Sequence, residues 1–361
     1  MKKSSLLLLS VLSITALTSC NSAALQDNKP VIRNVILMIG DGMGLPHVYA
    51  AMTVSADTLN IAKCKTTGLQ TNYSADNYVT DSGASGTALA TGVKTKNGSI
   101  GVDANGNSVR SILEIAEANG LSTGLVSTSA LTHATPASFI AHQSSRGSYE
   151  QIAADFLKTD VDVIIGGGYD HFGKRQDNLN YIDSLKNKGY TVTTSLEETL
   201  ASNSTKLAGF TAPVHNPYRL KGRGDMLPES TKKAIDILSK NNKGFFLMVE
   251  GSQIDWAAHA NTADTLIDEV LDFDKAVGAA LDFAKKDGHT LVVVTADHET
   301  GGVTLVSGDK INHTVTLNFA TKDHTALTPL VYTYGPGSTD FTGFYDNTDI
   351  PKKIKKALGL K

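Results

Sequence analysis

The feature that most constrains the fold is an alternation of short apolar runs with segments of helical periodicity. The apolar runs are rich in valine and isoleucine, which is typical of strands covered on both faces of a sheet. They are Asn34–Ile39, Ser122–Ser127, Val161–Ile165, Phe245–Val249, Thr290–Thr295 and Leu330–Thr333. The helical segments between them are Val109–Ala118, Tyr149–Leu157, Tyr181–Lys188, Glu229–Ser239 and Ala263–Lys285. The alternation predicts an α/β fold, in which a central, mostly parallel sheet is sandwiched by helices.

Composition narrows the class of protein. The chain has 361 residues, of which 41% are hydrophobic and 19% charged, as in a globular enzyme-sized protein. Its formal net charge is -3, so no basic footprint argues for a nucleic-acid partner. Two cysteines are too few for a disulfide scaffold or a cysteine-based zinc module.

The N-terminal residues have the pattern of an export signal. Two lysines precede the apolar run Leu6–Leu17, which ends in the lipobox-like sequence Leu17–Cys20. We expect residues 1–19 to be a lipoprotein signal peptide, Cys20 to carry a lipid anchor and residues 20–29 to form a tether. Residues 30–361 would be a single folded domain, exported and held in the periplasm or cell envelope. The alternative is an ordinary signal peptide with a chance cysteine.

Acidic residues follow three of the predicted strands. Asp41, Glu250 and Asp297 come directly after or close to the strand ends, and His298 is adjacent to Asp297. Carboxyl ends of parallel strands meet at one edge of a sheet, where gathered carboxylates repel one another and require cations. A lone aspartate at a strand end is more often a turn former or helix cap. Three such ends together favour a metal site.

The types of side chain suggest which ions would bind. Asp255 and His259 are four residues apart, so on a helix both would face one ion. Histidine mixed with carboxylate favours zinc, whereas oxygen ligands alone favour magnesium. His324 is a weak signal by itself. We expect the remaining histidines to be structural or surface residues: His47, His142, His171, His215, His289 and His313.

The segment Thr80–Gly92 is small and rich in hydroxyl groups, which suits a loop entering a helix and binding an anion. Ser82 is the candidate nucleophile, although Ser82 or Asp81 could simply cap the helix. No histidine lies nearby in the sequence to act as its base, so activation by metal is favoured over a Ser-His-Asp triad.

Together these segments resemble the alkaline phosphatase family. The motifs occur in the family's order across nearly the whole chain: Asp41–Gly44, Thr80–Thr91, Thr132–Ala137, Glu250–His259, Thr295–Gly302 and His324-Thr325. The resemblance implies a metal-dependent phosphate monoester hydrolase in which residues 30–361 form the catalytic domain. Residues from about 170 to 227 would be a peripheral excursion.

The resemblance also implies two zinc sites. Asp255, His259 and His324 would hold the first zinc. The second zinc would bind the following set: Asp41, Asp297, His298 and Ser82.

A third site, usually for magnesium, would use Asp41, Thr135 and Glu250. Arg146 stands at the position of the family's phosphate-binding arginine. His133 replaces an acidic residue near the third site, so zinc could take the place of magnesium there. Trp256 stands where relatives carry lysine or histidine.

In the implied mechanism, Ser82 attacks a phosphate monoester, forms a phosphoserine and is then freed by hydrolysis, which releases inorganic phosphate. Broad substrate range and a homodimer are expected by the same resemblance. Three other functions compete with this one. Arg146 argues against a phosphodiesterase, the missing C/S-x-P-x-R context argues against a sulfatase, and Ser82 argues against a non-catalytic phosphate- or metal-binding lipoprotein.

Overall fold

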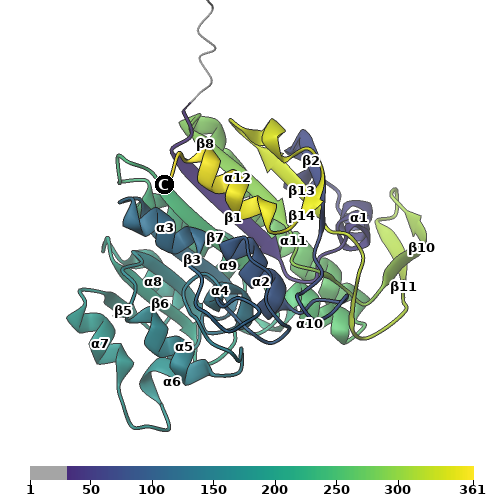
Figure 1. Ribbon diagram of the computed structural model, residues 1–361. Coiled ribbons are helices and arrows are strands. Elements are labelled where there is room, and N and C mark those ends of the chain that lie inside the picture. The colour runs from purple at the N-terminus through teal and green to yellow at the C-terminus, as the bar shows by residue number, and fades with distance from the viewer. Residues whose placement is uncertain (1–30) are drawn as a thin grey trace, which may run out of the picture.

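The computed structural model describes residues 31–361, so the predicted signal peptide, Cys20 and the tether lie outside the described residues (Figure 1). Ten strands form one sheet: β1 (Asn34–Gly40), β2 (Thr66–Thr71), β3 (Ser122–Ala130), β4 (Val163–Gly167), β5 (Thr191–Thr193), β6 (Leu207–Ala212), β7 (Phe245–Gly251), β8 (Thr290–Thr295), β13 (Leu330–Tyr334) and β14 (Gly343–Asp346). Their spatial order is β14-β2-β13-β8-β1-β7-β3-β4-β6-β5.

The sheet is mostly parallel, as predicted. Strands β8, β1, β7, β3, β4, β6 and β5 all run in one direction. Strand β13 is antiparallel to both of its neighbours, β8 and β2, and β14 pairs parallel with β2. Apolar periodicity identified β13 as a strand but carries no information on its direction.

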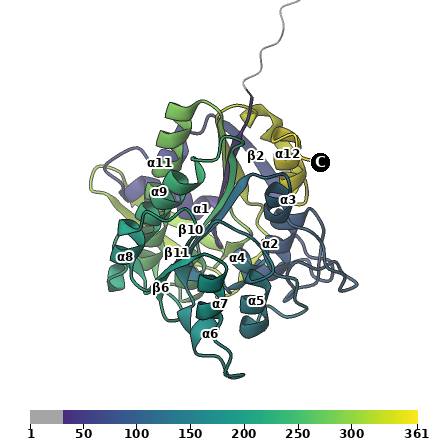
Figure 2. The ribbon, with the colours of Figure 1, turned by 90° about the vertical axis from the view of Figure 1, so that its left-hand side faces the viewer.

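Helices cover both faces of the sheet (Figure 2). One face carries α1 (Leu45–Val54), α8 (Leu196–Ala201), α9 (Met226–Leu238), α10 (Gln253–His259) and α11 (Ala263–Asp287). The other carries α2 (Ser82–Thr91), α3 (Ile112–Ala118), α4 (Ala134–Ala137), α5 (Tyr149–Phe156), α6 (Tyr169–Gly173), α7 (Tyr181–Asn187) and α12 (Asp349–Ala357). Short 3-10 turns are Asn60–Lys63, Arg219–Lys221 and Ser338–Phe341.

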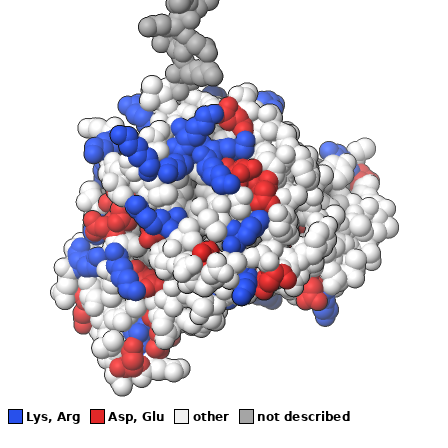
Figure 3. All heavy atoms as spheres, in the orientation of Figure 1, with Lys and Arg blue, Asp and Glu red and all other residues white. Residues whose placement is uncertain are grey.

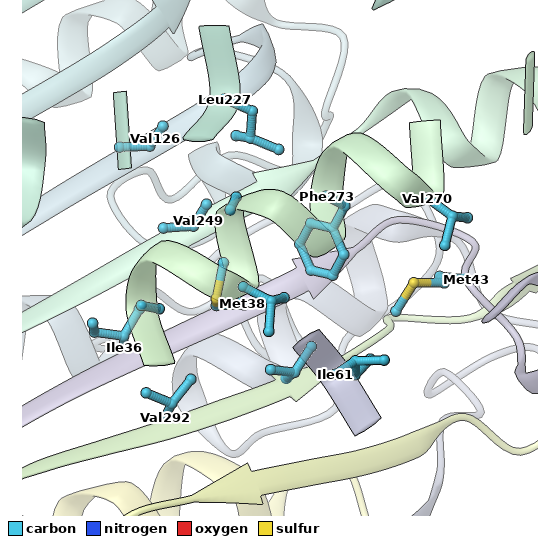
Figure 4. Close-up of a cluster of buried hydrophobic side chains, with 14 of the residues drawn as sticks. Ile36, Met38, Met43, Ile61, Val126, Leu227, Val249, Val270, Phe273 and Val292 are labelled. Carbon is cyan, nitrogen blue, oxygen red and sulfur yellow. The ribbon is translucent and has the colours of Figure 1, made fainter. Parts of the chain in front are cut away.

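Two hydrophobic cores result, because successive side chains of each central strand point to opposite faces. In β1, Ile36 and Met38 pack with α11 on one side, where Phe273 and Val270 reach the sheet (Figure 4). Val35, Leu37 and Ile39 belong to the other core. Every residue of β1, β7 and β8 is buried, which explains their continuous apolar sequences.

The segment from Asp170 to Leu227 lies at one end of the sheet and extends it. It supplies the last two strands, β6 and β5, and the helices α7 and α8. Two small antiparallel ribbons complete the described part: β10 (Val303–Asp309) with β11 (Thr314–Phe319), and β9 (Glu299–Thr300) with β12 (His324–Thr325). Among residues 31–361, no helix has the length and apolarity needed to span a bilayer.

Candidate metal centre

The polar residues predicted from the strand ends meet at the carboxyl edge of the parallel strands. Asp41 follows β1, Glu250 lies near the end of β7, and Asp297 and His298 follow β8. The ribbon β9–β12 holds His324 beside Thr300, and α10 carries Asp255 and His259. One edge of the sheet thus collects side chains that are up to 283 positions apart (from Asp41 to His324).

The first cluster consists of Asp255, His259 and His324, whose ligand atoms lie within 4.8 Å of one another. Asp255 Oδ1 is 3.2 Å from Nε2 of His259 and 3.5 Å from Nε2 of His324. The Nδ1 atoms of His259 and His324 face the carbonyl oxygens of Lys322 and Thr80. A carbonyl only accepts, so each Nδ1 donates its proton, and Nε2 is the nitrogen of each ring that faces the shared space and can bind an ion once it has lost its proton.

The second cluster joins Asp41, Asp297 and His298. His298 Nε2 is 3.5 Å from Asp41 Oδ1 and 3.3 Å from Asp297 Oδ2. It is also 3.2 Å from the hydroxyl of Ser82, the first residue of α2. The backbone N–H groups of Gly42 and His298 donate to Asp297 Oδ1, whereas Oδ2 is buried and accepts no hydrogen bond from the described residues.

Gly42 is required by its surroundings. Its φ is +70°, and a Cβ there would lie 2.6 Å from the hydroxyl of Thr300 and 3.0 Å from the Asp255 backbone. Any larger side chain would therefore push the two clusters apart.

The third cluster joins Asp41, His133 and Glu250. Within the described residues, both Asp41 oxygens, Glu250 Oε1, His133 Nδ1 and the Thr135 hydroxyl are buried without a hydrogen-bond partner. Buried polar atoms are nearly always paired, so unpaired atoms on all three members of this cluster fit a bound cation. Asp41 belongs to both the second and the third cluster.

Three serine hydroxyls fix Glu250. Its Oε2 accepts hydrogen bonds from Ser127 at 2.5 Å, Ser252 at 2.6 Å and Ser129 at 3.3 Å. With Oε2 saturated, Oε1 is the oxygen left for the third cluster. Sequence reasoning gave these serines no role, since Ser127 and Ser129 lie 123 and 121 positions from Glu250.

The electrostatics of the centre call for positive charge. Burial, followed by the charges of Asp297, Asp255 and Glu250, raises the pKa of Asp41 well above its usual range. Burial also raises the pKa of Asp297 to about 7. Without metal, the site therefore holds protons on groups that are ordinarily ionised. Cations at the three clusters would displace those protons.

Arg146 is held beside the centre by an ion pair. Its Nη1 lies 2.9 Å from Oδ2 of Asp81, and its Nη2 lies 3.4 Å from Nε2 of His133. Asp81 is the N-cap of α2, since its Oδ1 accepts the N–H of Ala84 at 2.9 Å. The capping role considered for Asp81 is confirmed, and orienting Arg146 is a second role that the sequence did not reveal.

Two aromatic neighbours also border the third cluster. Trp256 and His215 both stand edge-on to the ring of His133, with centroids 5.7 and 5.6 Å away. His215 also accepts the N–H of Ala130 through Nδ1, at 3.0 Å. Expected to be structural, His215 in fact lies next to a predicted site residue.

Comparison with known proteins agrees with this geometry. A family model described as alkaline phosphatase matches residues 32–318. The chain belongs to the alkaline phosphatase family. "Alkaline phosphatase 4" of Bacillus subtilis (strain 168) is 44% identical over 310 residues, covering 81% of this chain and 67% of that protein.

Solved alkaline phosphatases have the same fold, which confirms the predicted class. That of the Antarctic bacterium TAB5 is 43% identical with a TM-score of 0.88, covering 91% of this chain and 99% of the other. A TAB5 variant with a histidine replaced by aspartate has Mg bound in the M3 site. It is 42% identical with a TM-score of 0.87, covering 92% and 99%. Family members hydrolyse phosphate monoesters and depend on metal, and this chain is such a hydrolase.

Proposed function

We propose that this alkaline phosphatase works through a phosphoserine intermediate on Ser82 and releases inorganic phosphate. The observation that carries the proposal is the position of the Ser82 hydroxyl, 3.2 Å from Nε2 of His298 in the second cluster. The hydroxyl is buried at the start of α2, whose N-terminal N–H groups face incoming anions.

We assign two zinc ions and one magnesium ion to the three clusters. The first two clusters mix imidazole with carboxylate, which favours zinc. When bound, the ions supply positive charge that favours the ionised forms of serine and water and neutralises phosphoryl oxygens. Asp255, His259 and His324 would hold the first ion, and Asp41, Asp297 and His298 the second.

Thr135, Glu250, Asp41 and His133 would hold the third ion. Carboxylate and hydroxyl oxygens favour magnesium, whereas the nitrogen of His133 makes zinc an alternative. The TAB5 variant with Mg in its M3 site has an aspartate in place of a histidine, which supports this dependence on the ligand.

The chain's own residues would perform the transfer as follows. Arg146 presents two N–H groups to two phosphoryl oxygens, a fork that matches a monoester dianion. Ser82 Oγ gives up its proton to solvent and attacks phosphorus, forming the O–P bond as the alcohol oxygen leaves from the opposite side and takes up a proton. Water then attacks the phosphoserine in line, so that Ser82 is regenerated and phosphate leaves. Two in-line steps give net retention at phosphorus.

A comparison of two ester types tests the substrate assignment. We expect kcat/KM for an aryl phosphate monoester to exceed that for the matching diester by several orders of magnitude. In Arg146→Ala the monoester rate should fall far more than the diester rate, because only the monoester has the extra anionic oxygen. Equal losses for both esters would place Arg146 away from the phosphoryl group and favour a phosphodiesterase.

A homodimer is proposed as the working form. Support comes from an exposed apolar patch along the outer edge of the sheet, formed by Leu69, Tyr73, Tyr78, Leu327 and Phe344, which are 40–78% exposed. Strand β14 ends the sheet there, and its Phe344 pairs with Leu69. Light scattering should give twice the chain mass, and Phe344→Lys should shift it toward the monomer.

Export and anchoring through Cys20 complete the proposal, on the evidence of the lipobox-like sequence. Broad use of phosphate monoesters is proposed as well, because the centre addresses the phosphoryl group. Cys20→Ala should move the phosphatase from the membrane fraction to the soluble envelope fraction. Retention in the membrane fraction would contradict a lipid on Cys20.

A further inference from the structure

One surface of the molecule is strongly basic although the chain as a whole has a formal net charge of -3. Lysines gather over the C-terminal helix α12 (Figure 3). We call this the α12 face, defined by Lys352, Lys353, Lys355, Lys356 and Lys361. The opposite side of the helix is apolar: Ile350 and Ile354 are fully buried in the sheet's second core.

Few acidic groups neutralise this face. Asp349 pairs with Lys352 at 3.0 Å, and Asp340 lies 3.7 Å from Lys356. Asp346 pairs instead with Lys94, at 3.1 Å. Within residues 31–361, Lys353, Lys355 and Lys361 have no ion-pair partner, and Lys353 donates only to the backbone carbonyl of Asp340. The face therefore keeps an excess of positive charge.

The α12 face lies beside the point where the chain enters the described structure (Figure 1). The carbonyl of Val31 accepts a hydrogen bond from His289, just before β8. Ile32 lies against Gly337, which precedes the short turn containing Asp340, the neighbour of Lys353 and Lys356. Contacts thus run continuously from the entry of the chain to the lysines.

The same face points away from the metal centre. The chain enters the described structure where β1, β7 and β8 begin, whereas the metal clusters lie where these strands end. Helix α2 starts at Ser82 and ends near Thr348, the residue before α12. Ten residues of α helix separate the two ends by about 15 Å.

We propose that the α12 face docks on anionic lipid headgroups of the membrane that holds the anchor, with the metal centre turned away from it. This rests on the proposed lipid at Cys20. From Cys20 to Pro30 the chain can reach at most about 40 Å, so the body stays close to the bilayer. The lysines of the α12 face are attracted to an anionic membrane surface, and salt screens this attraction. A net negative body would otherwise be repelled.

The single tryptophan of the chain provides the test. Trp256 lies beside His133 at the metal centre, so energy transfer from it to a dansyl-labelled lipid reports how near that edge is to the bilayer. The full-length chain is placed on phosphatidylcholine vesicles with about one third phosphatidylglycerol. We expect low transfer at low salt and a clear increase in 0.5 M salt, as the docked body is released.

Two matched variants test whether the lysines of the α12 face cause the low transfer. Replacing Lys352, Lys353, Lys355 and Lys356 by glutamine should give the high transfer already at low salt. Replacing Lys174, Lys186, Lys232 and Lys310, which lie on other surfaces, removes the same charge and should leave transfer low. Transfer that is independent of salt, or equal in the two variants, overturns the proposal.

The anchor is tested separately by sedimentation in 1 M salt, in which a lipidated chain stays with the vesicles. If 1 M salt removes the chain from the vesicles, the proposed lipid anchor is wrong. Docking is then measured by sedimentation with vesicles at low salt. Docking predicts that the α12 variant loses at least ten-fold in association there while the control variant does not. Equal association of the two variants with the vesicles would overturn the docking proposal.

Discussion

The hydroxyl of Thr300 lies 2.5 Å from Oδ1 of Asp255 and 3.2 Å from Nδ1 of His298. Thr300 donates to the carboxylate and accepts from the imidazole, so one side chain orients ligands of both the first and the second cluster. Replacing it by valine keeps the volume and removes the hydrogen bonds.

For Thr300→Val we expect ten- to a hundred-fold faster loss of zinc to a chelator, and a fall in kcat/KM of about the same size. Thr300→Ser keeps the hydroxyl and should remain close to the unmodified protein. Zinc release followed with a colorimetric chelator measures the effect. Equal release from the valine and serine variants would contradict the role of the hydroxyl.

Asp81 should control phosphate affinity through Arg146. In Asp81→Asn the amide oxygen can still cap α2, but the charge that pairs with the guanidinium is lost. We expect KM for a monoester and the inhibition constant of inorganic phosphate to rise about three- to ten-fold, because the pair is partly exposed. Asp76→Asn on the neighbouring loop, where Asp76 accepts the N–H of Asn97, is the control. Unchanged phosphate inhibition in Asp81→Asn would refute the coupling.

Zinc affinity should depend on pH in two ranges. A hydrogen bond to Asp255 raises the pKa of His259 to about 9 in the metal-free protein, and burial raises that of Asp297 to about 7. Both groups must lose their protons to bind an ion, so affinity falls as pH falls. Weakening of the first cluster begins below about pH 9. In the second cluster, protonation of Asp297 weakens binding below about pH 7, and the raised pKa of Asp41 adds to that loss. Each proton lowers the affinity by up to ten-fold per pH unit.

Competition with a chelator from pH 6 to 10, on protein with one cluster disabled at a time, measures these ranges. His324→Ala isolates the second cluster, and His298→Ala isolates the first. A zinc affinity that does not change with pH in either variant would contradict the protonation states assigned to the metal-free centre.

Replacing His133 by aspartate should change the metal preference of the third cluster. The new carboxylate gives a ligand set made only of oxygen, which magnesium prefers and zinc does not require. We expect magnesium affinity to rise at least ten-fold relative to both the unmodified protein and His133→Ala. Magnesium content after dialysis against graded Mg²⁺ gives the result. Equal affinities in the aspartate and alanine variants would show that residue 133 does not contribute a ligand.

Sequence reasoning located the centre because strand ends and residue chemistry are both local properties. Asp41, Glu250 and Asp297 could be placed at one edge of the sheet from the apolar runs before them. Four of the ten strands in the sheet were not predicted: β2, β5, β6 and β14. Of these, β2 (Thr66–Thr71) and the edge strand β14 (Gly343–Asp346) are partly exposed and contain few apolar residues. Their pairing depends on contacts between distant parts of the chain.

The residues that orient the metal ligands could not be predicted from the sequence either. Thr300 contacts Asp255 across 45 positions, and Ser127 contacts Glu250 across 123. Hydroxyl side chains are common in loops and strands, so neither had a distinguishing pattern. The direction of β13 is a further example, because only its antiparallel partners β2 and β8 reveal it.

The most direct test of the account is the detection of phosphate on Ser82. Protein loaded with zinc and magnesium is quenched in acid during turnover of a phosphate monoester, and phosphopeptides are mapped by mass spectrometry. We expect phosphate on Ser82 alone, and none in Ser82→Ala that still binds zinc at the first cluster. Rapid turnover with no phosphorylated Ser82, together with inversion at phosphorus, would contradict it.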